Sequence, residues 1–393
     1  MAKGIGRSPT AALFGGCITD RSIKQALILV AALAFVLALC SFSGGKDIDY
    51  GLAFDGQSSD LGRTEIVAAF ESPMPAGHNV VWCSAFQVAW DMLAEDVFDG
   101  PIGLEGAEAV AGLLNRSRAS EADLAPESYF AAAGRATEGL VESIDREMAA
   151  RFPDAAPPDF VADENNFLAY AYLSVAIGFA HPYFDEPHGL IFRDSAGGLA
   201  EVAAFGVGPD DDDGRAARAQ VEPLFYGEGD DGSVEFAVDL GGDSRYRIVA
   251  ARVAPRGTLA DTCDYVAARA SEHPQSGAYR TLGEDETLSM PAISWRIVHR
   301  FGDLENRPFL NDGFRRHGIA DAVQMIEFRL DREGVVLRSE AEIQTYTGIE
   351  AAAPGRREFI FDRPFLLYVA LRSAENPVFA VWIDNEELLV ASE

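Results

Sequence analysis

The sequence predicts a mixed α+β fold in one domain, and three observations favour this prediction. The chain has 393 residues, of which 48% are hydrophobic and 24% are charged, a composition typical of globular proteins. After residue 70, segments with a helical period alternate with segments of strand character. No long low-complexity linker separates them, so we expect one domain at 70–393 after a linker at 46–69.

The expected elements follow from local periodicity. Helices are expected where apolar residues recur every three or four positions and Gly or Pro stands near the ends. These segments are 84–95, 106–116, 127–152, 259–271 and 304–317. Strands are expected where Val, Ile, Phe and Tyr are frequent between Gly, Asp or Pro. The clearest strands are 167–178, 234–240, 245–254, 288–299, 323–330, 334–344, 359–372 and 377–383, mostly at hairpin spacing.

The N-terminal segment has the pattern of a membrane-targeting sequence. The 21 residues from Gln25 to Gly45 carry no charge, and four basic residues and one acidic residue precede them. We therefore expect a cytoplasmic tail at 1–24 and a transmembrane or signal-anchor segment at 25–45, with the rest of the chain outside the cytoplasm. If this segment is cleaved instead, the protein would be secreted.

The charge balance excludes one class of partner. The chain has 62 acidic and 32 basic residues, a net charge of -30, which repels polyanions. Nucleic acid is therefore not expected as a partner. No lysine follows Lys46, so the exported body must have an acidic surface with arginine as its only strongly basic residue. Such a surface suits high ionic strength or an external medium.

No sequence signature of enzymatic chemistry occurs in the chain. The nucleophile elbow, the phosphate-binding loop, the dinucleotide fingerprint and the helical zinc motif are all missing. Two histidines and two carboxylates lie within eight positions, including His181, Asp185 and His188, and a zinc site there is a minor alternative to a structural loop. Cys83 and Cys263 allow one disulfide and require none. We predict no cofactor and no metal.

Several motifs in the last 110 residues stand in a familiar order. Arg315–Val323 precedes a strand, Gly348-Ile349-Glu350-Ala351-Ala352-Ala353 follows it, and Phe361-Asp362-Arg363-Pro364-Phe365 comes next. This order resembles the serpin family, in which Leu-Gly-Ile-x-Asp-Ala-Phe, Gly-Thr-Glu-Ala-Ala-Ala and Arg-Pro-Phe occur in succession. Weaker matches lie upstream, at Asn79–Ser84, at Phe179–Tyr183 and at Arg245–Leu259.

The resemblance implies a serpin-like fold, with a large mixed or antiparallel main sheet, additional sheets and about seven to nine helices. It also implies a reactive loop that a protease cuts and whose hinge then inserts into the main sheet. Small residues at Gly348, Ala351, Ala352 and Ala353 fit that hinge, whereas Ile349 replaces the usual Thr. Pro354 lacks the amide that a central strand must donate, so insertion beyond it should be costly.

In this register the loop is short, and a second register is open. Only 10 positions separate Ala353 from Arg363, which supplies too little extended chain for a full strand. The second register takes Glu333-Gly334 as the hinge and Val335 to Arg357 as the loop, with Arg356 or Arg357 as the residue cut by a trypsin-like protease. We rank it lower because its inserting residues are bulky and charged.

The sequence thus leads to one functional expectation and two alternatives. We expect a serpin-like, membrane-anchored surface protein that is not an enzyme, does not inhibit proteases and binds a protease or another protein. The first alternative is a working serine protease inhibitor with a short reactive loop. The second is a hydrolase or metal-binding protein that uses His181, Asp185 and His188.

Overall fold

The computed structural model describes residues 51–153, 160–174, 176–208, 214–241, 245–272, 281–336 and 357–392. All of them belong to one unit, Tyr50–Glu393. The predicted cytoplasmic tail and the predicted anchor at 25–45 lie outside the described residues. Within the described ranges, no helix is both long enough and apolar enough to cross a membrane.

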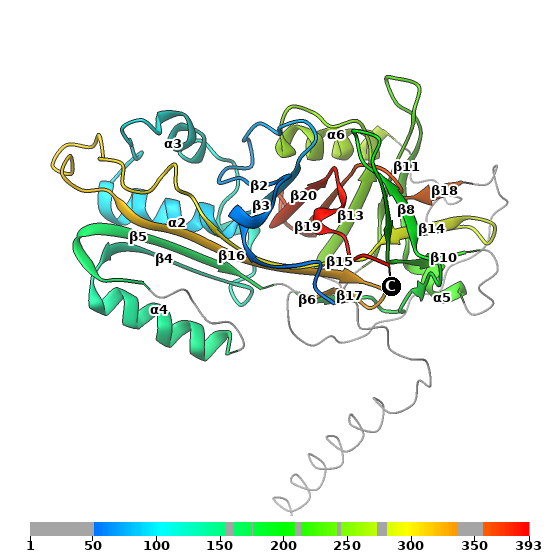
Figure 1. Cartoon of the computed structure of the whole chain (residues 1–393), viewed down its shortest axis with the longest axis horizontal. Helices are drawn as coiled ribbons and strands as arrows, with labels where there is room; N and C mark the ends of the chain where they lie inside the picture. The colour runs from blue at the N-terminus through cyan, green and yellow to red at the C-terminus, as the bar shows by residue number, and fades with distance from the viewer. Residues whose placement is uncertain are drawn as a thin grey trace, which may run out of the picture. The chain divides into compact units, whose positions relative to one another are not determined.

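The longest strands form one mixed sheet, which we call the main sheet. Its strands run in the order β4 (Tyr129–Ala136), β5 (Asp163–Leu173), β16 (Ile319–Asp331), β15 (Ile293–Arg300) and β1 (Phe54–Gln57). Two short strands, β17 (Gly334–Val336) and β6 (Ala176–Gly178), extend it beside β16. The pairs β5–β16 and β1–β15 are parallel and the others antiparallel, so the predicted large mixed sheet is confirmed (Figure 1).

In the part of the chain that the structure describes, two further sheets and one separate hairpin complete the β structure. The second sheet has the order β11 (Glu222–Glu228), β12 (Val234–Asp239), β13 (Tyr246–Arg252), β19 (Phe365–Leu371), β20 (Phe379–Ile383), β3 (Asn79–Cys83) and β2 (Thr64–Ile66). The third has the order β18 (Glu358–Ile360), β14 (Thr287–Pro291), β10 (Ala204–Val207) and β7 (Phe184–Asp185). The hairpin pairs β8 (Leu190–Arg193) with β9 (Leu199–Val202).

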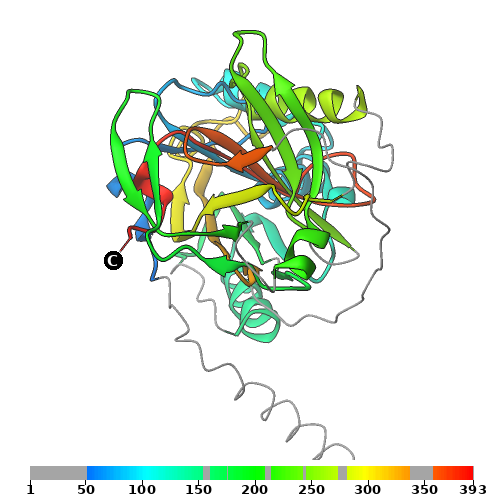
Figure 2. The same ribbon diagram turned by 90° about the vertical axis from the view of Figure 1, so that its right-hand side faces the viewer.

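The helices divide the apolar interior into three clusters. The main core lies between the main and second sheets and includes α2 (Ala85–Leu93), which continues as the π-helix η2 (Ala94–Phe98). α6 (Leu259–Glu272) covers the other face of the second sheet, and α4 (Glu138–Arg151) covers the outer face of the main sheet. Figures 1 and 2 show α4 and α6 on opposite sides of these layers. The shorter elements are α3 (Glu108–Leu114), α5 (Arg215–Gln220), η1 (Ser58–Asp60), η3 (Glu121–Asp123) and η5 (Glu386–Leu388).

The helix predicted at 127–152 is wrong over its first part, which forms β4. The alanine-rich run has a helical composition, but its side chains alternate between two apolar environments. Phe130 and Ala132 pack toward α4, whereas Ala131 and Ala133 pack toward the main core. A helix begins only after Thr137, whose hydroxyl oxygen accepts a hydrogen bond from the amide of Leu140 (3.2 Å). Tertiary burial here outweighs helix propensity.

The helix predicted at 304–317 is also wrong, since this stretch contains no helix. Its backbone groups do not pair in a helical pattern, because Leu310 donates its amide to the carbonyl of Gly103 and Phe309 donates to the carbonyl of His317, eight residues later. Asn306 and Gly313 have positive φ angles of 56° and 85°, which a right-handed helix cannot contain. The predicted linker differs as well, because β1, η1 and β2 lie within residues 46–69 and join the sheets.

Candidate functional site

Two long strands at the centre of the main sheet run parallel and pair directly. β5 and β16 pair from Phe167 opposite Ile319 to Leu173 opposite Ile326. Their outer neighbours, β4 and β15, run antiparallel to them. Two parallel strands can accept a third strand between them that is antiparallel to both. We call the line along which β5 and β6 face β16 the seam.

One end of the seam is already open and holds β17. This strand lies between β16 and β6 and is antiparallel to both, with Val335 opposite Leu330 on one side and Ile177 on the other. Leu330 lies four residues after Ile326, and Ile177 lies four residues after Leu173, the last directly paired residues. The register across the seam is therefore the same with or without an intervening strand. A strand continuing from β17 could pair with both sides without slippage.

The turn that leads into β17 requires glycine. Gly334 has a φ angle of 143°, and a Cβ atom at this position would lie 2.2 Å from the carbonyl oxygen of Ile177. The carbonyl of Glu333 accepts a hydrogen bond from the amide of Phe179 (2.8 Å). Backbone contacts with β6 and the residue after it therefore fix the start of β17.

The two faces of the seam have different surroundings. Toward the main core, β5 and β16 present apolar side chains such as Ala169, Leu173 and Ile326. Toward α4 they present Tyr170, Tyr172 and Met325, which pack with apolar residues of that helix. The hydroxyl of Tyr170 is buried there with no hydrogen-bond partner among the described residues, and this burial raises its pKa. A strand in the seam would meet an apolar core on one side and a tyrosine hydroxyl on the other.

A single polar side chain on β16 interrupts the core face of the seam. Gln324 is fully buried, and its side-chain amide donates a hydrogen bond to the carbonyl of Cys83 (3.2 Å), just before α2. Its side-chain oxygen is buried with no hydrogen-bond partner among the described residues. Burial also raises the pKa of the Cys83 thiol to about 12, so this cysteine stays protonated and unreactive. The contact ties the middle of β16 to the start of α2.

The residues from β17 onward have the sequence pattern of a strand with two different faces. Apolar or small residues alternate with larger and mostly polar ones from Val335 to Gln344. The first set is Val335, Leu337, Ser339, Ala341 and Ile343, and the second is Val336, Arg338, Glu340, Glu342 and Gln344. Val335 is buried in the main core, so the first set would face the core if the strand continued. From 337 on, this is an expectation from the sequence.

The structure bears on the two hinge registers in different ways. The hinge at Gly348, Ile349, Glu350, Ala351, Ala352 and Ala353 lies outside the described residues, as do Pro354 and Arg356. β17 begins at Gly334, where the second register places its hinge, and β18 begins at Glu358. Arg357 is described, and it is buried and paired with Glu286. Among the described residues, Gly334–Val336 is the segment that lies in the seam.

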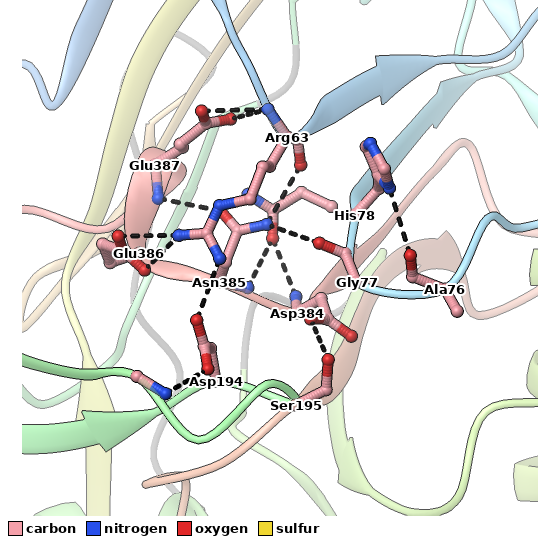
Figure 3. A network of polar contacts seen from close by, with 12 residues as sticks. Arg63, Ala76, Gly77, His78, Asp194, Ser195, Asp384, Asn385, Glu386 and Glu387 are labelled. Carbon is pink, nitrogen blue, oxygen red and sulfur yellow. Dashed lines mark hydrogen bonds and ion pairs between the residues drawn. The ribbon is translucent and has the colours of Figure 1, made fainter.

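A second polar cluster joins the ends of the folded unit (Figure 3). The Arg63 guanidinium contacts the carboxylates of Asp194 (2.9 Å) and Glu386 (2.8 Å), and the Arg63 amide donates to Glu387 (2.9 Å). Beneath it, Asn385 is fully buried and accepts a hydrogen bond from the Asn79 side chain (2.9 Å). These contacts link β2, β3, the β8–β9 turn and η5. They indicate a structural role, which is to hold together segments that are far apart in the sequence.

The residues proposed as metal ligands do not form a metal site. Asp185 instead lies 3.5 Å from the guanidinium of Arg332 at the end of β16, and the amide of His181 donates to the side chain of Gln220 (3.1 Å). Over the described ranges, no three His, Cys, Asp or Glu side chains are arranged to hold a metal ion. Cys83 and Cys263 are both buried free thiols.

Sequence reasoning missed the polar residues that matter most to these sites. Gln324, Glu286 and Asn385 each pair with a residue far away in the chain, so no local pattern reveals them. A signal was available for Gln324, because it is the one uncharged polar residue within a strand-like run from Ala322 to Leu330. A polar residue at a core-facing position of a strand indicates a specific buried contact.

Comparisons with known proteins concern the fold. No protein-family model and no curated protein sequence matches the chain. Native protease nexin-1 with heparin has a TM-score of 0.46 at 9% identity, covering 78% of this chain and 92% of that one. The thermophilic serpin Tengpin in its native state has a TM-score of 0.44 at 12% sequence identity, and the match covers 84% of this chain and 99% of Tengpin. Serpin48 from the insect Tenebrio molitor has a TM-score of 0.43 at 13% sequence identity, and the match covers 79% of this chain and 92% of Serpin48.

Proposed function

We propose that this protein is a serpin-like, non-catalytic protein. A protease binds and cleaves its 337–356 segment, and the cut segment then inserts into the seam. The observation that carries the proposal is the continuous register of β5 and β6 against β16, with β17 already in place between β6 and β16. The alternating pattern from Val335 to Gln344 supplies a strand with a core face for that position. The proposal adopts the second register, in which the loop is not short.

Insertion would release free energy for a physical reason that the sequence supports. Leu337, Ala341 and Ile343 would move into the main core between β5 and β16. The new strand would form one ladder with β5 and one with β16 in place of the single ladder that now joins these two strands, a net gain of backbone hydrogen bonds. In the uncut chain the segment is attached at both ends, to β17 and to β18, and a cut would remove this constraint on insertion. Cleavage therefore acts as the trigger.

The experiment measures thermal unfolding of the full chain before and after one cut. Residues 347–353 are replaced by the seven-residue recognition sequence of a site-specific protease, so that only this segment is cleaved. Insertion is expected to raise the unfolding midpoint by roughly 10 °C or more. Ala341→Arg should abolish the rise, because it puts a charge toward the core between Gln324 and Ala171. Gln344→Arg, on the opposite face of the same strand, should leave the rise in place.

A second candidate function is a binding protein whose segment never inserts. The outer face of the seam favours it, because Glu340 and Glu342 would fall opposite Tyr172 and Tyr170, which α4 covers. Burying two carboxylates there is costly unless they are well hydrogen-bonded. An unchanged midpoint after complete cleavage would support this candidate and contradict insertion.

The membrane anchor at 25–45 remains a proposal about where this function is carried out. Its uncharged run and the basic residues before it support a single span with the folded unit outside the cytoplasm. Extraction of membranes at alkaline pH tests it, since a spanning segment stays with the lipid and a cleaved, secreted form does not. Recovery of the whole protein in the soluble fraction would contradict the anchor.

A further inference from the structure

The C-terminal end of the 337–356 segment meets a buried ion pair. Arg357, the first described residue after it, is 8% exposed, and Glu286 is 5% exposed. The Arg357 Nε donates to Glu286 Oε1, and its Nη2 donates to Oε2 at 2.8 Å, so the contact is bidentate. Both nitrogens of one edge of the guanidinium are engaged by one carboxylate, which is the strongest geometry for this pair.

The surroundings hold both partners in place. Glu286 precedes β14 and Arg357 precedes β18, and the parallel pairing of Thr287 with Glu358 sets them side by side. The amide of Gly283 donates a second hydrogen bond to Glu286 Oε2 (2.8 Å). The Arg357 guanidinium lies 5.3 Å from the ring of Phe359, whose side chain is fully buried. The pair is therefore part of the packed interior and not a surface contact.

From this geometry we infer that Arg357 is the fixed end of the segment, a positioning residue held by Glu286, and not the residue that a trypsin-like protease takes into its pocket. Such a protease binds an arginine side chain by surrounding it and pairing it with its own carboxylate. Arg357 must first leave Glu286 uncompensated in the interior, which is strongly unfavourable. The inference rests on the proposed function in one respect, that this segment is what a protease meets.

The consequence concerns which bonds can be cut. Between Glu333 and Glu358 the chain has three arginines, Arg338, Arg356 and Arg357, and no lysine. With Arg357 fixed, a trypsin-like enzyme is limited to Arg338 and Arg356 in this segment. A cut at either position leaves the residues from Arg357 onward attached to the folded unit through Glu286 and β18.

The test uses the full chain with Arg338→Gln and Arg356→Gln, so that Arg357 is the only trypsin site in the segment. Trypsin is added at low concentration, and the fragment that begins at Glu358 is quantified by mass spectrometry. This parent protein should release the fragment slowly. Adding Glu286→Gln, which removes the charge and keeps the shape, should speed its release on the order of 100-fold.

A matched control and a second variant keep the result decisive. Asp362→Asn removes a neighbouring but more exposed ion pair, between Arg252 and Asp362 (3.0 Å), and should change the release by less than about threefold. Arg357→Lys keeps a trypsin site and loses the bidentate contact, so it should also be cut faster. If the Glu286→Gln protein fails to fold, trypsin will cleave at arginines throughout the chain. In that case the cleavage rate of the Arg357→Lys protein tests the inference.

Two outcomes would overturn the inference. The parent protein could be cut after Arg357 as fast as the Glu286→Gln protein, or the Arg357→Lys protein could resist as well as the parent does. Neither outcome bears on strand insertion, which the unfolding midpoint of the protein cut at 347–353 reports separately. Failure of the fixed end and failure of the proposed function are thus told apart.

Discussion

At the scale of single residues, one half-buried carboxylate should make stability depend on pH. Burial raises the pKa of Asp91 on α2 to about 6, in spite of a 2.7 Å hydrogen bond from Gln87, and the charge of Glu95 adds to the rise. The unfolded chain has a pKa of about 4 at this position, so the folded state holds the proton more tightly. This contribution to stability is present in full below about pH 4 and is lost as the pH rises through about 6.

We expect Asp91→Asn, which cannot ionise, to raise the free energy of unfolding at pH 8 by about 1–2 kcal/mol. The gain should shrink toward zero at pH 4, where Asp91 itself is protonated. Denaturant unfolding at pH 8, 6 and 4 measures both values. Asp96→Asn, at an exposed position on the following π-helix η2, is the matched control and should change the free energy of unfolding by less than about 0.5 kcal/mol. An equal gain at all three pH values would contradict the assignment.

The residues that matter at this scale were the least predictable from the sequence. Arg357 and Glu286 are 71 positions apart, and Asn79 and Asn385 are 306 apart. Each is an ordinary polar residue in its local context, and only the fold creates the buried partner. The sequence identified Arg357 as a candidate cleavage residue because arginine suits a trypsin-like protease, but a local pattern contains no information about burial.

At the scale of elements, the start of β17 depends on one glycine. We expect Gly334→Ala to lower the free energy of unfolding by about 2–4 kcal/mol, because the added Cβ collides with the β6 backbone and the φ angle is unfavourable for alanine. Denaturant unfolding measures the loss. Gly313→Ala is the control, since Gly313 also has a positive φ but no atom lies within 4 Å of its Cβ position. It should lose only about 1 kcal/mol.

The same substitution connects the hinge to the proposed insertion. If β17 cannot form in the Gly334→Ala protein, the cut segment has no starting point in the seam, and the rise in midpoint should disappear. A loss of stability similar to that of Gly313→Ala would contradict the close backbone contact. A normal rise after cleavage would show that insertion does not begin from β17.

Elements were predictable where local and tertiary preferences agree. α6 and β12 were located within one or two residues because their apolar period matches the face they bury. β4 failed because its alanines suit a helix locally but pack against both faces of the sheet, with Ala132 buried on one face and Ala131 and Ala133 partly buried on the other. The choice between hinge registers stays a prediction, because residues 348–353 lie outside the described residues, while the alternation that begins at Val335 is a second signal in the same stretch.

At the scale of the whole molecule, the charge is strongly one-sided. After Lys46 the chain has 61 acidic and 27 basic residues, and every basic residue there is an arginine. The ion pairs of the surface, such as Arg118 with Asp264 (2.8 Å), are largely exposed and contribute little individually. Many carboxylates therefore repel one another across the folded unit more strongly than in the expanded unfolded chain.

Salt should therefore stabilise this protein. We expect the unfolding midpoint at pH 8 to rise by about 5 °C between 0.05 M and 1 M NaCl, because the screening length falls from above 10 Å to about 3 Å and repulsion among the carboxylates weakens. Calorimetry measures the midpoint. At pH 4, where many carboxylates are protonated, the same salt should have a smaller effect, and sucrose of equal osmolality at pH 8 should not reproduce it. A midpoint that falls with salt would mean that the arginine ion pairs outweigh the repulsion.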